Sequence, residues 1–117
     1  MKAGHLILLV LSVNLLSACS PHPSAGKWKA ISENEFGISD ISILFDGKAE
    51  FTTAGKDAAV WHCFWGGKSK SEATMNCVPS TDADRRETYQ FVVDGAEQGR
   101  LFQQGKLIAT FERKSYQ

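Results

Sequence analysis

After Gly26, short glycine-containing turns divide the chain into segments in which apolar and polar residues alternate. Asp46-Gly47 and Asp94-Gly95 are strong signals for two-residue hairpin turns, and Gly66-Gly67 and Gly105 add further punctuation. Alternation with a period of two places every second side chain on the same face of a strand. The pattern therefore restricts the fold to an all-β architecture of consecutive antiparallel hairpins.

The spacing of these turns predicts eight strands, most of them joined by short turns. Eight is the number of strands at which a small up-and-down barrel closes around its own side chains. We therefore expect a small antiparallel meander of about eight strands, folded as a barrel or a flattened barrel. The expected strands are residues 27–32, 41–45, 48–54, 59–65, 71–78, 87–93, 98–104 and 106–114.

Two segments add detail to this expectation. In the last strand, Leu107, Ala109 and Phe111 fall on one face. In the segment before residue 87, Ser80 or Thr81 suits a helix N-cap, with two aspartates in the first turn. We therefore allow one short helix near residues 80–87.

The N-terminus has the pattern of an export signal. An almost wholly apolar run from Leu6 to Leu16 is shorter than the roughly 20 residues of a membrane-spanning helix. Leu16-Ser17-Ala18-Cys19 follows this run directly and resembles the bacterial lipobox. The resemblance implies removal of residues 1–18 as a lipoprotein signal peptide and acylation of Cys19, palmitate being one such acyl group. The alternative is an ordinary secretory signal that is cut elsewhere.

The same resemblance implies a location. In Gram-negative lipoproteins, a serine such as Ser20 after the lipidated cysteine is compatible with transfer to the outer membrane. We therefore expect a lipid-anchored outer-membrane protein that faces the periplasm or the cell surface. Residues 19–26, with two prolines and no periodicity, are expected to form a lipidated tether, and residues 27–117 a single domain.

Cys63 and Cys77 remain as a pair for an oxidising compartment. They are symmetric about Lys70, so a hairpin turning at residues 68–72 places them opposite each other. A disulfide there closes a loop of about 15 residues and contributes about 3 kcal/mol in the chain-entropy model. It also sets the register: one face carries Trp61, Cys63, Trp65, Met75 and Cys77, and the other carries Val60, His62, Phe64, Thr74 and Asn76.

The two ends of the domain carry a second resemblance. "GKW", with Gly26 and Trp28, opens the first strand, and "FERK", with Arg113, ends the last. These stretches resemble the lipocalin-type arrangement, in which Gly-x-Trp opens the barrel and a basic residue of the last strand packs over the tryptophan. The resemblance implies those roles for the three residues. A core tryptophan in another small β fold is the alternative interpretation.

Charge and residue types exclude several functions. Removing Lys2 from the 13 Lys and Arg leaves 12 basic against 13 acidic residues, with no basic stripe for nucleic acid. His62 is the only histidine of the expected domain, and its neighbour Cys63 points to the opposite face of the strand. Asp82 and Asp84 lack the glycine and the later acid of a calcium loop. We therefore expect no enzyme, no metal site and no cofactor.

The segment "VWHCFWGG" is apolar on both faces. One face fills the core, and the other exposes Val60 and Phe64 or, in the opposite orientation, the two tryptophans. A covering loop or the N-terminal segment is the alternative. Because exposed aromatic side chains are enriched at partner surfaces, we predict a protein-binding surface on this strand, made of Val60, Trp61, His62, Phe64 and Trp65.

Two classes of function remain. The first is a tethered module that binds a protein, as an inhibitor, immunity, exclusion or secretion-assembly accessory lipoprotein. The alternative is a lipocalin-like carrier of a lipid or small apolar ligand. Strands of about seven residues tilted by about 40° give a barrel less than about 20 Å tall, and the aromatic side chains largely fill it. Protein binding is therefore favoured, with the partner and the oligomeric state left open.

Overall fold

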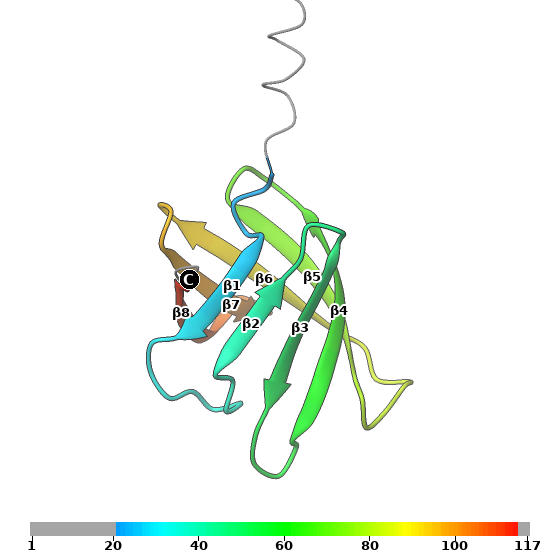
Figure 1. Ribbon diagram of the computed structural model, residues 1–117. Coiled ribbons are helices and arrows are strands. Elements are labelled where there is room, and N and C mark those ends of the chain that lie inside the picture. Colours follow the sequence, from blue (N-terminus) through cyan, green and yellow to red (C-terminus); the bar gives the residue numbers. More distant parts are fainter. Residues whose placement is uncertain (1–20, 115–117) are drawn as a thin grey trace, which may run out of the picture.

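The computed structural model describes residues 21–114, which form eight strands in one closed antiparallel barrel (Figure 1). Each strand pairs with the next along the chain, and β8 pairs with β1. The strands are β1 (Gly26–Ala30), β2 (Asp40–Ile43), β3 (Lys48–Thr53), β4 (Ala59–Gly67), β5 (Glu72–Pro79), β6 (Glu87–Asp94), β7 (Gln98–Gln103) and β8 (Lys106–Arg113). The predicted all-β meander is confirmed, in its barrel form.

The predicted signal peptide, residues 1–18, and the lipidation site Cys19 lie outside the described residues. From residue 21 to residue 114, no helix is long and apolar enough to cross a membrane.

The meander places its loops alternately at the two ends of the barrel (Figure 1). The end at which the chain enters β1, here called the N-terminal end, carries the turns 44–47, 68–71 and 95–97. The opposite end, here called the open end, carries the loops 31–39, 54–58, 80–86 and 104–105.

The predicted disulfide and its register are confirmed. Cys63 of β4 is bonded to Cys77 of β5, and the two residues are paired across the strands with their Cα atoms 4.0 Å apart. Trp65 accordingly lies opposite Met75, and Phe64 lies opposite Asn76. The symmetry about the turn was sufficient because a two-strand hairpin pairs positions equidistant from its turn.

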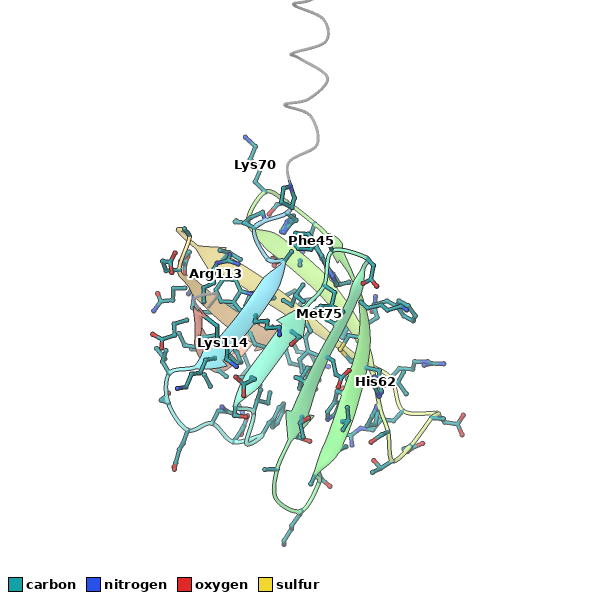
Figure 2. The ribbon with its side chains drawn as sticks, in the orientation of Figure 1. Phe45, His62, Lys70, Met75, Arg113 and Lys114 are labelled. Atoms are coloured by element: carbon teal, nitrogen blue, oxygen red, sulfur yellow. A yellow bond between two sulfur atoms is a disulfide. The ribbon has the colours of Figure 1, made fainter. Side chains whose placement is uncertain are left out.

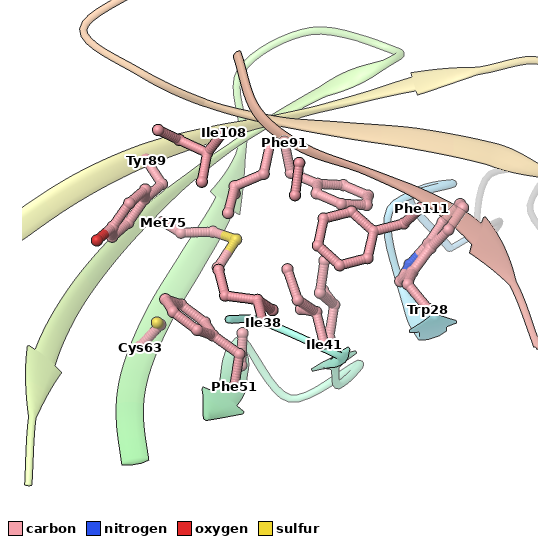
Figure 3. Close-up of a cluster of buried hydrophobic side chains, with 14 of the residues drawn as sticks. Trp28, Ile38, Ile41, Phe51, Cys63, Met75, Tyr89, Phe91, Ile108 and Phe111 are labelled. Atoms are coloured by element: carbon pink, nitrogen blue, oxygen red, sulfur yellow. The ribbon is translucent and has the colours of Figure 1, made fainter. Parts of the chain in front are cut away.

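Alternate side chains of all eight strands fill the interior (Figure 3). Trp28, Phe91 and Phe111 are fully buried, with ring centroids 5.0 Å apart for Trp28 and Phe91 and 6.0 Å apart for Phe91 and Phe111. Gly99 of β7 makes room for this cluster, because a Cβ there would clash with the ring of Phe91. The interior is a packed core of aromatic and aliphatic side chains.

Arg113 of β8 closes the N-terminal end of the barrel (Figure 2). Its guanidinium carbon lies 4.2 Å from the centroid of the Trp28 ring. Its Nη1, Nη2 and Nε donate to the carbonyl oxygens of Ala25, Pro23 and Ala96 at 2.8, 2.6 and 2.8 Å. This contact between Arg113 and Trp28 is the one that the lipocalin-type resemblance implied for the two residues.

The segment 22–25, which belongs to the expected tether, is bound to the N-terminal end. Two of its carbonyl groups accept from Arg113, and the carbonyl oxygen of Ser24 accepts from Trp28 Nε1 at 2.9 Å. His22 Nε2 lies 2.7 Å from the carbonyl oxygen of Ser69, and its ring packs edge-on against Trp65. These contacts hold the chain before β1 against the barrel.

The prediction that Leu107 shares the inward face of the last strand with Ala109 and Phe111 is wrong. β7 and β8 shift register between Leu101, opposite Ala109, and Phe102, opposite Leu107, so that Ile108 is the extra residue of a β-bulge. A bulge interrupts the alternation of faces. Leu107 is consequently 48% exposed, whereas Ile108 is 7% exposed and joins the core.

The helix allowed near residues 80–87 does not form, and the segment folds as turns. The Asp82 side chain accepts from the amide of Asp84 at 3.1 Å, and its carbonyl accepts from the amide of Arg85 at 3.2 Å. An aspartate side chain that bonds the backbone two residues on stabilises a turn. Because only seven residues join the two strands, the cost of nucleating a helix is not recovered.

Candidate functional site

The structure divides the five residues of the predicted binding surface between the two faces of β4. Val60, His62 and Phe64 face outward: Val60 is half-buried, His62 is exposed, and Phe64 is 70% exposed. No loop among residues 21–114 covers Phe64. Of the two predicted orientations of this strand, the structure therefore has the one that exposes Phe64 and not the tryptophans.

The two tryptophans of the strand face inward and lie at opposite ends of the barrel. Trp61 is buried toward the open end, where its Nε1 donates to Thr53 Oγ1 at 3.2 Å. Trp65 is half-buried at the N-terminal end, where its Nε1 donates to the carbonyl oxygen of Leu44 at 2.7 Å. The five predicted residues thus do not form one surface.

Phe64 belongs to an outer patch that includes a residue the sequence analysis did not select. Leu44, in the turn after β2, is 46% exposed and shares a groove of about 280 Å³ with Phe64. Lys48, Glu50 and His62 border this groove. We call these five residues the outer patch. They come together because β3 pairs with β4, with Lys48 opposite Phe64 and Glu50 opposite His62.

The polar side chains of the outer patch are exposed to solvent. His62 Nδ1 and Glu50 Oε2 are 3.8 Å apart on the solvent side, where an ion pair contributes little. The neighbouring Cys63 sulfur faces the core and is engaged in the disulfide. Within residues 21–114, no group of three or more His, Cys, Asp or Glu side chains is placed to hold a metal ion.

A second candidate site lies at the open end of the barrel. A half-open cavity of about 290 Å³ is formed between the loops 31–39, 54–58 and 80–86. We call it the mouth pocket. Six of the side chains that line it matter for its chemistry: Phe36, Trp61, Arg85, Glu87, Tyr89 and Gln103.

The inner wall of the mouth pocket is made of the Trp61 and Tyr89 rings, which pack against the core residue Phe51; Figure 3 shows Phe51 and Tyr89. Phe51 and Trp61 are stacked, with ring centroids 5.9 Å apart and planes 8° apart. Tyr89 meets both rings edge-on, at 5.7 Å from Phe51 and 6.3 Å from Trp61. Such edge-to-face arrangements are favourable for aromatic rings, so the wall is preformed.

Charged groups form the rim. The Arg85 guanidinium carbon lies 5.1 Å from the Trp61 ring centroid, and Arg85 Nε donates to Glu87 Oε1 at 3.3 Å. Gln103 Nε2 donates to the other carboxylate oxygen of Glu87 at 2.7 Å. Burial, together with the negative charge of Glu87, raises the pKa of Tyr89 to about 12, against the smaller opposing effect of Arg85. The phenol is therefore protonated at neutral pH.

No pattern in the sequence predicted the mouth pocket. Alternation along residues 87–93 indicates that Tyr89 points inward, but it does not show that the ring ends beside a cavity. Arg85 precedes an acidic residue in a polar turn and gives no signal that it folds back over Trp61. One feature of the sequence could have indicated the pocket: in the expected meander, Trp61 and Tyr89 both lie near loops at the same end of the barrel.

Comparison with known proteins found no match, whether to protein-family models, curated proteins or solved structures.

Proposed function

We propose that the protein is a lipid-anchored binding module that acts on a protein partner through the outer patch. The observation that carries this proposal is the exposed aromatic ring of Phe64, beside the exposed Leu44, on the wall of a barrel whose other strand aromatics largely face the core. Phe45, in the same turn as Leu44, is exposed as well. An apolar centre bordered by Lys48, Glu50 and His62 has the anatomy of a protein interface.

The closed barrel also supports recognition through side chains. Every strand from β1 to β8 is paired on both sides, so within residues 21–114 the barrel offers no free edge to which a partner strand can add. A partner must therefore contact the outward side chains or the loops. Phe64 is the most exposed aromatic side chain on a strand of the described barrel, which makes it the natural anchor of such a contact.

The position of the outer patch suits an anchored protein. Leu44 lies in a turn of the N-terminal end, where the segment 22–25 is also bound, and Phe64 lies in the half of β4 that runs toward that end. A chain lipidated at Cys19 would hold this end near the membrane. We therefore propose a partner that is itself at or near the membrane surface, which suits an immunity, exclusion or secretion-assembly lipoprotein or an inhibitor.

The packed interior supports this proposal over a lipid carrier. Trp28, Phe91 and Phe111 occupy the volume that a lipid chain would need. The mouth pocket, at about 290 Å³, lies at the lower limit of about 300 Å³ for small-molecule sites.

A photo-crosslinking amino acid at position 64 of the full lipidated chain, in its own host membrane, tests this proposal. The matched control carries it at Leu107, an exposed apolar residue on β8. We expect position 64, and not position 107, to become linked to one protein. The affinity of that purified protein for the chain should then fall about thirtyfold or more with Phe64→Asp, the loss expected for an interface hot spot.

Folding is measured in parallel. Because Phe64 is exposed, Phe64→Asp should change the free energy of unfolding by no more than about 0.5 kcal/mol, as should Leu107→Asp. If Phe64→Asp leaves the affinity unchanged, or if Leu107→Asp lowers it equally, the outer patch is not the interface.

A further inference from the structure

We propose that the mouth pocket is a binding site for an uncharged aromatic molecule of one or two rings that carries a single hydroxyl or carbonyl group. This site is separate from the outer patch and does not depend on the function proposed for that patch. It lies at the open end of the barrel, and of its lining residues only Trp61 belonged to the predicted protein-binding surface.

The dimensions and walls of the pocket define the apolar part of the ligand. A volume of about 290 Å³ is slightly below that of sites for drug-sized ligands and is suitable for a smaller molecule. The Trp61 and Tyr89 rings form the inner wall, and the half-buried Phe36 lines the side. Flat aromatic walls favour a flat apolar ligand that can pack against their faces or edges.

The Tyr89 hydroxyl defines the polar part. Tyr89 is 2% exposed, and its hydroxyl forms no hydrogen bond with any group in residues 21–114. In Figure 3 the oxygen points away from the core cluster, and Tyr89 lines the mouth pocket. The hydroxyl is not among the fully buried unpaired atoms of residues 21–114, so its oxygen is open to solvent in the pocket. A ligand that enters the pocket takes the place of this solvent, and one that donates to the hydroxyl or accepts from it keeps a hydrogen bond there.

The charges of the rim favour an uncharged ligand. Glu87 is held by Arg85 and Gln103, and Glu35 is paired with Lys106 at 3.1 Å. Lys56 and Asp57, which also line the pocket, are adjacent in the chain and opposite in charge. Each carboxylate therefore has a compensating group nearby. The rim therefore has no uncompensated positive charge to hold an anion and no uncompensated negative charge to hold a cation. A cation would in addition compete with Arg85 for the face of Trp61.

Calorimetric titration of the full chain in detergent micelles, with 2-naphthol as the probe and empty micelles as the reference, tests this inference. We expect saturable binding of 2-naphthol. Tyr89→Phe should weaken it about five- to tenfold, the effect of one lost hydrogen bond. The hydroxyl has no partner in the protein, so this variant should fold as the parent does.

The control variant Thr52→Val removes a hydroxyl from the exposed outer side of β3 and should leave binding unchanged. 2-Naphthoate, which has the same rings and a carboxylate, should bind at least tenfold more weakly than 2-naphthol. The inference is overturned if 2-naphthol does not bind the parent chain, or if Tyr89→Phe and Thr52→Val have equal effects. Equal affinity for 2-naphthoate would overturn the uncharged class of ligand.

Discussion

Individual side chains determine whether each end of the barrel is closed or keeps a cavity. At the N-terminal end, Arg113 contacts Trp28 and donates to three carbonyl groups, so that one side chain joins the last strand to the chain before the first. At the open end, Tyr89 and Trp61 stop short of filling the barrel, and Arg85 leans over the remaining space. One end is therefore closed by hydrogen bonds, whereas the other keeps a cavity.

The buried phenol of Tyr89 makes stability depend on pH in the alkaline range. In the unfolded chain the phenol loses its proton near pH 10, whereas in the folded protein its pKa is about 12. Above pH 10 the unfolded state binds fewer protons than the folded state, so stability is complete below pH 10 and is lost as the pH rises to about 12. The expected loss is about 2–3 kcal/mol at most.

Urea unfolding at a series of pH values from 8 to 12 measures this loss. Tyr89→Phe cannot ionise and should lose correspondingly less stability over the same range, whereas the lysines and the remaining tyrosine contribute equally to both chains. Identical pH profiles for the two proteins would contradict the prediction.

At the scale of single strands, the two faces of β4 and the bulge of β8 show how far an alternating pattern can be followed. β4 keeps its alternation from Trp61 to Phe64 because the disulfide and unbroken pairing with β3 and β5 hold the register. In β8 the alternation of inward and outward side chains is interrupted at Ile108, because this residue has no paired residue in β7. The alternation is therefore reliable only where the pairing on both sides is continuous.

The bulge predicts opposite effects for two adjacent residues of β8. Ile108→Asn places a polar group in the core and removes buried apolar volume, so we expect it to lower the free energy of unfolding by about 2–4 kcal/mol. Leu107→Asn changes an exposed position and should alter it by no more than about 0.5 kcal/mol. Denaturant unfolding of both variants measures the difference, and a larger loss for Leu107→Asn would show that the strand alternates without a bulge.

The whole molecule is organised about the axis between its two ends. The bound segment 22–25 enters at the N-terminal end, and the mouth pocket opens at the other. If Cys19 carries the lipid, residues 19–21 span at most about 10 Å when extended. The N-terminal end would then face the membrane closely, and the mouth pocket would point away from it.

We predict that the exported chain begins at Cys19 and carries acyl groups there, because "LSAC" directly follows the apolar run. Two or three acyl chains are needed for a stable anchor, since a single chain binds only marginally. Mass spectrometry of the exported protein measures both the cleavage point and the acyl mass. Cys19→Ala is the matched variant and should lack the acyl mass. An unmodified chain cut at another position would contradict the prediction.

The sequence by itself determined the features of this protein that depend on neighbours along the chain. The eight strands follow from alternation and from turns such as Asp46-Gly47 and Asp94-Gly95. The outward direction of Phe64 follows from the symmetric placement of Cys63 and Cys77 about one hairpin. These features were predictable because turn chemistry and strand periodicity act within a few residues.

Only the tertiary structure decided the features that depend on residues far apart in the chain. Arg113 binds carbonyl groups 88 and 90 residues away, and this contact holds part of the expected tether against the barrel. Arg85 folds over Trp61, and the bulge at Ile108 follows from the pairing of β7 with β8. The mouth pocket likewise arises where three loops meet. No local pattern encodes these contacts, because each exists only once the closed sheet has brought its parts together.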